Sequence, residues 1–301
     1  MNSPGLTFSG LGKAWDPNKY GKKGFKDKPY IIIRSAAVPH ERIAKVQSPV
    51  ARVIFMATPK VVMKLENVCK VYGEGDVSVK ALCDINLEFR EGEVAAIMGP
   101  SGSGKSTMLH ILGLLDRPTQ GRLFLDGIET STLSDDELAG IRGKKIGFVF
   151  QFFFLVPSLT VLENVMLPMM LLGIDELERE RHARDLLKKV GLEDRMHHLP
   201  SELSGGQRQR TAIARALANN PSIIFADEPT GNLDSKTGNE IMQLFDDLHK
   251  KDGRTIIFVT HDPSLVEHSE RVIQLKDGKI ERIIGNGKTM LRKVANIHLK
   301  K

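Results

Sequence analysis

The fold is decided by Gly99-Pro100-Ser101-Gly102-Ser103-Gly104-Lys105-Ser106-Thr107, which has the G-x-x-x-x-G-K-[ST] pattern of a phosphate-binding loop. An apolar run over 94–98 precedes it, and the apolar positions of 108–112 suit a helix packed on a sheet. Glycines let successive N–H groups turn towards one phosphate, at a helix N-terminus that favours anions. Lys105 would then reach the β- and γ-phosphates and Ser106 would bind Mg²⁺, whereas a plain Gly-rich turn is the alternative.

The bulk composition is that of an ordinary globular chain of 301 residues, with 41% hydrophobic and 27% charged residues. No stretch reaches the roughly 18 uninterrupted apolar residues of a membrane span. The longest candidate, 165–174, contains Pro168 and Gly173. Two cysteines, Cys69 and Cys83, have neither metal-site nor disulfide-framework spacing and indicate a reducing compartment.

The positive charge is concentrated in residues 1–62, where 11 Lys/Arg and 3 Asp/Glu give +8 and leave −2 for the rest of the chain. This near-neutral remainder argues against nucleic acid as a partner. The segment has no sustained helical or strand period, so it is predicted to be a disordered extension or the product of a mis-called start, with Met63 just before the first clear strand. A basic arm that touches anionic lipid or nucleic acid is the other interpretation.

From residue 63 onwards the pattern becomes regular. Capping signals at Ser134 and Thr160 predict helices, and a charged helix over 175–190 is expected to pack through one side. Residues 285–301 are expected to form a basic tail. That packing side comprises Leu177, Ala183, Leu186 and Leu187. The predicted strands cover 64–71, 79–89, 121–125, 145–150, 223–226 and 255–260, followed by a hairpin of 272–275 and 279–283.

Two adjacent acids, Asp227 and Glu228, end an apolar strand. A buried carboxylate needs a partner, and Mg²⁺ at Ser106 would be one for Asp227. Glu228 faces a different direction and could polarise a water towards the γ-phosphate. A helix-capping acid or a surface ion pair is the alternative.

His261 follows another apolar strand, and its imidazole could hydrogen-bond the γ-phosphate and orient the attacking water. Gln151 lies where a strand meets an aromatic loop, and its amide oxygen could complete the metal shell. Each residue alone is weak evidence, because a polar side chain at a strand end often has a structural role.

A second loop, Ser204-Gly205-Gly206-Gln207, precedes a helix and is a second anion site by the same reasoning. One nucleotide needs only one such loop for its phosphates. We therefore expect the second loop to cover a nucleotide bound by another copy, in a two-fold dimer that encloses two nucleotides.

Together these motifs resemble those of the ATP-binding-cassette (ABC) ATPases, over residues 63–284. The resemblance implies a P-loop NTPase of the α/β class, with a mainly parallel sheet core, an antiparallel β subdomain and a helical subdomain over 152–205. It implies that Tyr72 stacks on adenine, that Gln151 is the Q-loop residue and that Glu228 is the catalytic base. In the same way Asp234 closes the D-loop and His261 is the switch histidine.

The sequences of 150–165 and 226–234 are similar to those of the lipoprotein-releasing, macrolide-export and cell-division branch of that family. One departure is Phe154, where asparagine is expected. The branch implies an ATP- and Mg²⁺-dependent ATPase that forms a homodimer when ATP is bound. It also implies a separate integral membrane permease, and so a cytoplasmic location on the inner face of the cell membrane. A soluble ABC ATPase that acts on ribosomes or DNA is the alternative.

Overall fold

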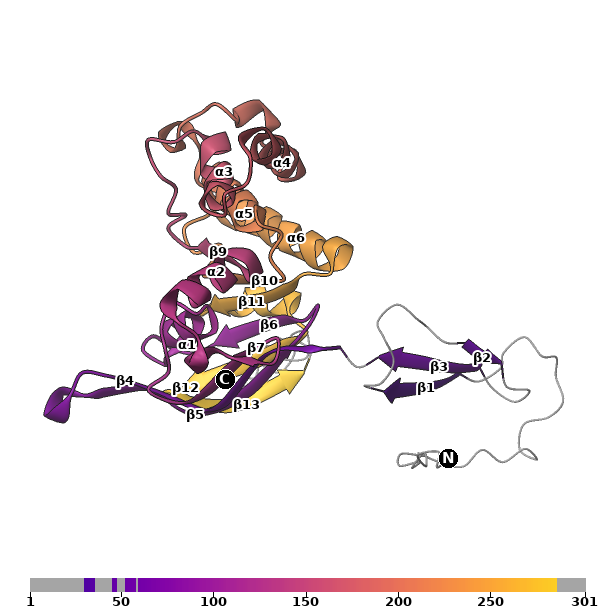
Figure 1. Ribbon diagram of the computed structural model, residues 1–301, viewed down its shortest axis with the longest axis vertical. Helices are drawn as coiled ribbons and strands as arrows, with labels where there is room; N and C mark the ends of the chain where they lie inside the picture. Colours follow the sequence, from indigo (N-terminus) through magenta and orange to yellow (C-terminus); the bar gives the residue numbers. More distant parts are fainter. Residues whose placement is uncertain (1–29, 36–44, 48–51, 58, 286–301) are drawn as a thin grey trace, which may run out of the picture. The chain divides into compact units, whose positions relative to one another are not determined.

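The computed structural model describes residues 30–35, 45–47, 52–57 and 59–285 (Figure 1). The chain divides into two compact units, with the division between Thr58 and Pro59. None of the helices in the described ranges has the length and hydrophobicity of a membrane-spanning segment.

The first unit contains a small sheet in the order β1-β3-β2, with β3 parallel to β1 and antiparallel to β2. Its strands are β1 (Tyr30–Ser35), β2 (Lys45–Gln47) and β3 (Arg52–Ala57). Residues 1–62 were expected to be a disordered extension or the product of a mis-called start, and sequence analysis predicted none of these three strands. Short apolar runs can pair as strands without a long period. Residues 1–29 of the expected extension and 286–301 of the expected tail lie outside the described residues.

The second unit is built on a six-stranded sheet in the order β13-β12-β6-β11-β10-β9, in which all neighbours except β12 and β13 run parallel. This confirms the expected mainly parallel core. The strands are β6 (Val94–Met98), β9 (Ile146–Phe150), β10 (Ile223–Asp227), β11 (Thr255–Thr260), β12 (Arg271–Lys276) and β13 (Lys279–Gly285).

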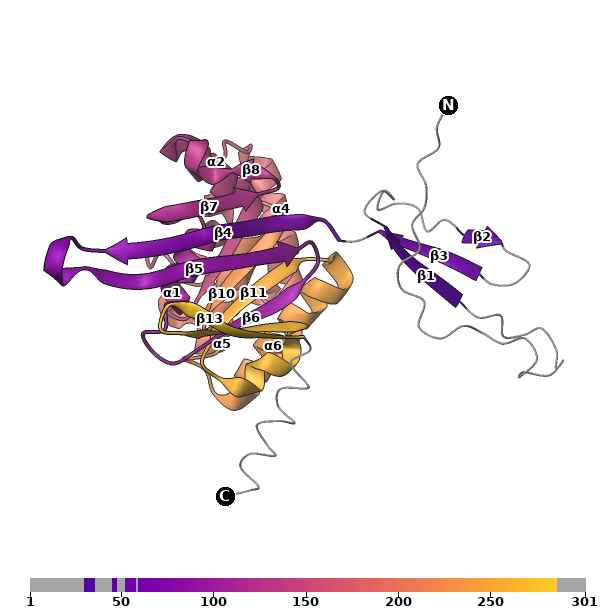
Figure 2. The same ribbon diagram turned by 90° about the horizontal axis from the view of Figure 1, so that it is seen from below.

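An antiparallel sheet in the order β5-β4-β7-β8 confirms the expected β subdomain. Figure 2 shows β4 and β5 side by side along one face of the unit, with their turn extending past the other strands. Because β4 begins at Val61, the expected domain boundary at 63 falls inside a strand. The strands are β4 (Val61–Tyr72), β5 (Val79–Arg90), β7 (Gln120–Leu125) and β8 (Ile128–Glu129).

Six α-helices occur in the described ranges, and only helices and connecting turns occupy 152–205, as expected of a helical subdomain. They are α1 (Lys105–Leu112), α2 (Asp135–Lys145), α3 (Val161–Leu171), α4 (Glu176–Lys189), α5 (Gly205–Leu217) and α6 (Ser235–Asp252). Short 3₁₀ turns cover Gly75–Val77, Thr130–Thr132, Glu193–Arg195, Pro200–Glu202 and Pro263–His268.

The central strands are buried on both faces, and their alternate side chains enter two different cores. In β10, Ile224 and Ala226 join a core with α3 to α6, whereas Ile223 and Phe225 join a core with α1 and the antiparallel sheet. A strand has a side-chain period of two, so an unbroken apolar run is what such a strand requires. Figure 1 shows this layering, with α3 to α6 on one side of the sheet.

Sequence analysis missed α6, although the signals were present. The Asp234 side chain accepts a hydrogen bond from the Thr237 N–H at 3.0 Å, and Gly253 ends the helix in the left-handed region at φ +65°. One further expectation is wrong: Leu177 of α4 is 78% exposed, whereas Ala183, Leu186 and Leu187 are buried as expected.

The start of α3 depends on Asn164, whose side chain is fully buried. Its amide nitrogen donates to the carbonyls of Val156, Leu159 and Thr160 at 2.9–3.1 Å, and its oxygen accepts from the Val156 N–H at 2.8 Å. This one side chain therefore satisfies the backbone of the loop that leads into α3.

Asn164→Ala is expected to lower the free energy of unfolding by about 2–3 kcal/mol, because it leaves several buried backbone groups without partners. Urea denaturation measures this loss. Met170→Ala on the same helix is the matched control, since Met170 is half-exposed and should cost much less. Equal losses for the two variants would contradict the role assigned to Asn164.

Candidate functional site

The candidate site lies at the carboxyl ends of β6, β10 and β11, which are neighbours in the parallel sheet (Figure 1). Met98 pairs with Thr260, and Asp227 pairs with Val259, so the segments that follow these strands emerge at one edge. Crevices at this edge are the usual ligand sites of open α/β sheets. The phosphate-binding loop, Glu228 and His261 therefore share one edge of the sheet.

The loop between β6 and α1 has the backbone that its glycines permit. Gly102 and Gly104 have φ of +76° and +99°, values at which other residues are strained. A Cβ at Gly104 would lie 2.5 Å from the Ala81 carbonyl, and one at Gly99 would lie 2.4 Å from the Leu275 carbonyl. Neighbouring backbone thus fixes the path of the loop.

Lys105, the first residue of α1, is buried, and its Nζ donates to the carbonyls of Gly99 and Pro100 at 2.9 Å each. Within the described residues the buried Ser103 hydroxyl has no hydrogen-bond partner. The loop therefore holds one ammonium group on replaceable backbone acceptors and one free hydroxyl, as a polar ligand site requires.

A cavity of about 480 Å³ opens in front of the loop and is lined by Asp227, which ends β10, and by Glu228, which follows it. The lining comprises Val79, Lys80, Ala81, Ser101, Gly102, Gly104, Lys105, Ser106, Thr107, Asp227, Glu228, Val259, Asp277 and Gly278. The structure thus brings together most of the loop, Asp227 and Glu228.

Sequence analysis missed two parts of this cavity, the start of β5 at 79–81 and the turn Asp277-Gly278 between β12 and β13. The Gly278 N–H donates to the Ser103 carbonyl at 3.2 Å, and the Cys83 N–H donates to the Gly278 carbonyl at 2.8 Å. Neither segment has a nucleotide-binding pattern in its own sequence. Both reach the cavity only through pairing between distant parts of the chain, so local patterns could not predict them.

The two acids differ in their surroundings. Burial, with a further contribution from the Glu228 charge, raises the pKa of Asp227, and His110 and Lys105 oppose this. Glu228 has φ +44°, and its N–H donates to the Val259 carbonyl at 2.8 Å. Asp227 is therefore a carboxylate with too little positive charge around it, which fits a cation ligand.

His261 Nδ1 lies 2.6 Å from Glu228 Oε1, although His261 is 67% exposed and Glu228 only 20%. Gln151 lies elsewhere: its amide nitrogen donates to Asn232 Oδ1 at 3.4 Å, and Asn232 Nδ2 donates to the Gln151 carbonyl at 3.0 Å. Gln151 therefore contacts Asn232 and is not among the residues that line the cavity.

The remaining expected site residues do not line the cavity of their own chain either. Ser204 caps α5 through a hydrogen bond from the Gln207 N–H, and Asp234 caps α6. Hydrogen bonds from Thr237 lower the pKa of Asp234. Tyr72, at the end of β4, donates its hydroxyl to Asp116. Residues 204–207 thus form the N-terminus of α5, apart from the cavity of their own chain.

The fold and this site define a P-loop nucleotide-binding protein. Strand β6 leads through a glycine-rich loop into helix α1, and this loop faces two acids at the end of β10, which is separated from β6 in the sheet by β11 alone. The family model described as ABC transporter matches residues 82–231. A Thermotoga maritima ABC transporter ATP-binding protein is 54% identical over 76% of this chain and 97% of its own length. The chain belongs to the ABC transporter family, as an ATP-binding ATPase cassette.

Other relatives agree with this assignment. The macrolide export ATP-binding/permease protein of Bartonella henselae is 50% identical over 73% of this chain, which spans 33% of that longer protein. The dimeric structure of the cassette MJ0796 of Methanocaldococcus jannaschii, bound to ADP and Pi, is 53% identical with a TM-score of 0.69. It covers 74% of this chain and 98% of its own.

Asp227→Asn is expected to raise the free energy of unfolding of the nucleotide-free protein at pH 7. A raised pKa means that the ionised carboxylate destabilises the folded chain, and this cost disappears below about pH 4, the ordinary range of aspartate. Urea denaturation at both pH values measures the change, which should shrink towards zero at the lower one.

The matched control is Asp247→Asn on α6, where the hydrogen bond from Lys251 lowers the pKa of the carboxyl group. This variant should lose stability at pH 7, the opposite direction. A loss of stability in Asp227→Asn at pH 7 would contradict the electrostatics described for the cavity.

Proposed function

We propose that this chain is the energy-coupling subunit of a transporter or mechanotransmission complex whose membrane permease is a separate chain. The observation that carries the proposal is the single cavity that collects the phosphate-binding loop, Asp227 and Glu228. The ATPase activity follows from the family, and the roles below are assigned from this geometry.

The residues of the cavity fit Mg-ATP. Open space beside Gly102, where a Cβ would meet no atom within 4 Å, leaves room for a phosphate group against the backbone. Ser106 and Asp227 would hold Mg²⁺, with Gln151 joining them after its amide leaves Asn232. The bound metal neutralises phosphate charge in phosphoryl transfer.

In hydrolysis Lys105 exchanges the carbonyls of Gly99 and Pro100 for phosphate oxygens, a gain in charge complementarity. Glu228 accepts a hydrogen bond from the attacking water and polarises it. His261, already 2.6 Å from Glu228, orients that carboxylate and donates to the γ-phosphate. Tyr72 stacks on the adenine.

The loop 204–207 acts on the nucleotide of a second copy. Its helix N-terminus favours an anion but does not line the cavity of its own chain. Asp234, at the next helix start, belongs to the same interface. We infer a homodimer that ATP closes, and the dimeric structures of MJ0796 support this.

The permease docks on a groove of about 610 Å³ between α2, β9, α3 and α5. Its apolar rim includes Leu171 (76% exposed), and Phe152 and Phe154 (66% and 62%) stand on the adjacent loop. Large exposed apolar side chains gathered at one groove are typical of protein partners. The ATP-binding/permease name of a similar, longer chain supports a permease partner. The complex would then place this chain on the inner face of the cell membrane. No nucleic-acid partner is proposed.

Glu228→Gln is expected to bind Mg-ATP and form a stable dimer, because hydrolysis no longer reopens it. Analytical ultracentrifugation with and without Mg-ATP measures this. Lys105→Ala in the same background should stay monomeric, since it cannot hold the phosphates. Ser204→Arg should keep ATP binding but lose the dimer.

A Glu228→Gln protein that remains monomeric at saturating Mg-ATP would contradict the shared-site dimer. Loss of ATP binding in Ser204→Arg would place the second loop on the nucleotide of its own chain.

The Glu228→Gln chain, loaded with Mg-ATP, is expected to retain an integral membrane protein from detergent-solubilised cells of its source. Mass spectrometry identifies the retained chains. Retention should fall at least about tenfold in Phe154→Asp, which places a charge on the apolar surface beside the groove. Leu177→Asp is the matched control, since Leu177 is also an exposed apolar side chain but lies on α4 and not on the loop beside the groove. Retention of ribosomal or DNA-bound proteins alone would contradict the permease proposal.

A further inference from the structure

Tyr72 is held by a polar network that the nucleotide cavity does not include. Its hydroxyl donates to Asp116 Oδ2 at 2.9 Å, and Asp116 lies in the turn that follows α1. Tyr72 as a whole remains 40% exposed. Burial and the bond to Asp116 raise the pKa of the Tyr72 hydroxyl, and the Thr107 side chain, at the end of the phosphate-binding loop, acts in the opposite direction. The Tyr72 hydroxyl is thus tied to the turn that follows α1.

Lys70 occupies one face of the Tyr72 ring, with its Nζ 4.9 Å from the ring centroid. The same Nζ lies 2.6 Å from Asp116 Oδ1 and 2.8 Å from the Arg117 carbonyl. Only 13% of the Lys70 side chain is exposed. One carboxylate oxygen of Asp116 therefore accepts a hydrogen bond from the Tyr72 hydroxyl, and the other pairs with the Lys70 ammonium group that covers one face of the ring.

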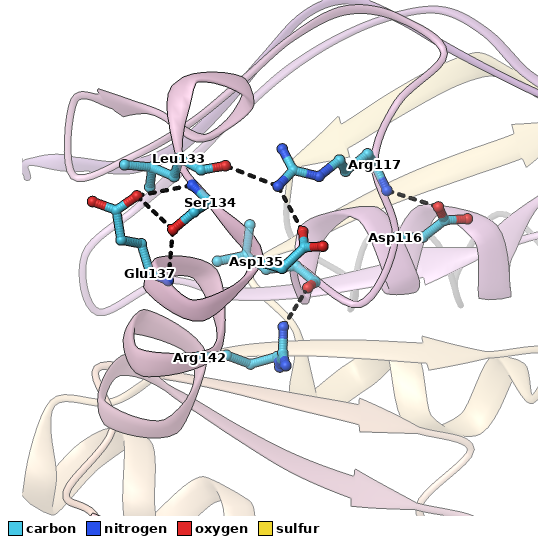
Figure 3. Close-up of polar contacts among 8 residues, drawn as sticks. Asp116, Arg117, Leu133, Ser134, Asp135, Glu137 and Arg142 are labelled. Atoms are coloured by element: carbon cyan, nitrogen blue, oxygen red, sulfur yellow. Dashed lines mark hydrogen bonds and ion pairs between the residues drawn. The ribbon is translucent and has the colours of Figure 1, made fainter.

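Asp116 is itself fixed from two sides. Its N–H donates to the His110 carbonyl at 3.2 Å, and the Arg117 N–H donates to its Oδ1 at 2.7 Å. The Arg117 guanidinium donates to the Leu133 carbonyl and to Asp135 Oδ1 at 2.8 Å each, which ties the turn to the start of α2 (Figure 3). The two backbone hydrogen bonds therefore fix the carboxylate at the end of α1. The link to α2 is only a surface contact, since the Asp135 side chain is 93% exposed.

We propose that Asp116 is a positioning residue for the base end of the nucleotide. By fixing the Tyr72 ring and seating Lys70 on one of its faces, it reserves the other face for the adenine. Since α1 carries both Lys105 and the turn with Asp116, the phosphate site and the stacking ring are held by one helix. The inference rests on the proposed stacking role of Tyr72.

The test compares the affinity of the full chain for Mg-ATP with that for Mg-tripolyphosphate, which has the phosphates but no base. Asp116→Ala is expected to weaken ATP binding about fivefold and to leave tripolyphosphate binding unchanged. Tyr72→Phe should weaken ATP binding to a smaller extent. The double variant should match Asp116→Ala alone, because the two residues act through one hydrogen bond.

The matched control is Asp135→Ala, which removes the other carboxylate of the Arg117 bridge without touching Tyr72 (Figure 3). Its affinities for both ligands should equal those of the unaltered chain. Should Asp116→Ala not fold, Tyr72→Phe makes the same test from the other partner, with ATP binding weakened and tripolyphosphate binding retained.

Equal weakening of ATP binding and tripolyphosphate binding by Asp116→Ala would overturn the inference. It would mean that Asp116 supports the phosphate-binding loop in general and not the base end of the nucleotide. Additive effects of Asp116→Ala and Tyr72→Phe would also overturn it. Failure of the proposed function gives a different result: Tyr72→Ala would then leave ATP affinity unchanged, whereas under the proposal it weakens ATP about tenfold or more.

Discussion

The structure of the cassette depends on the burial of its central strands on both faces. Strands β6, β10 and β11 have no polar face, so one layer must cover each side: α3 to α6 on one, and α1 with the antiparallel sheet on the other. Once these layers are in place, polar groups can leave the core only at the strand ends. The phosphate-binding loop and the acids after Ala226 occur at such ends, which is why one edge of the sheet collects the chemistry.

Within that edge the charges are poorly balanced, and this imbalance is what a nucleotide site requires. Asp227 is a partly buried carboxylate with a raised pKa, whereas Lys105 is an ammonium group held on neutral carbonyls. The two lie in one cavity without neutralising each other. A ligand that carries both negative phosphate oxygens and a divalent cation satisfies both groups together, which neither a simple anion nor a simple cation does. These unbalanced charges make the free energy of unfolding of the nucleotide-free protein lower than an apolar lining would, as is common for functional sites.

Local patterns predicted most of this arrangement, and the failures share one physical cause. The loop 99–107, the acids at the end of β10 and the caps at Ser134 and Thr160 are encoded in adjacent residues, so the sequence was enough to place them. The turn Asp277-Gly278 reaches the cavity only because β12 pairs with β6, a contact between distant parts of the chain. The strands within 30–57 depend in the same way on pairing. Only α6 had local signals, including an Asp cap and a closing glycine, that were overlooked.

One short loop joins the nucleotide edge to the groove beside α3. Gln151, at its start, exchanges hydrogen bonds with Asn232, which lies four residues after Glu228. Further along, the carbonyls of Phe153 and Phe154 accept hydrogen bonds from Arg215 of α5, at 2.7 and 2.5 Å. Helix α5 begins at the loop 204–207. The loop that starts at Gln151 therefore contacts two segments, the one with Asn232 and helix α5, and each adjoins residues that we assign to nucleotide contact. Phe153 and Phe154 adopt positive φ values of 63° and 46°, conformations that cost energy for a bulky side chain and therefore depend on those bonds. The exposed aromatic loop is thus hydrogen-bonded both to Asn232, near the nucleotide edge, and to α5, so its backbone conformation depends on the positions of these two segments.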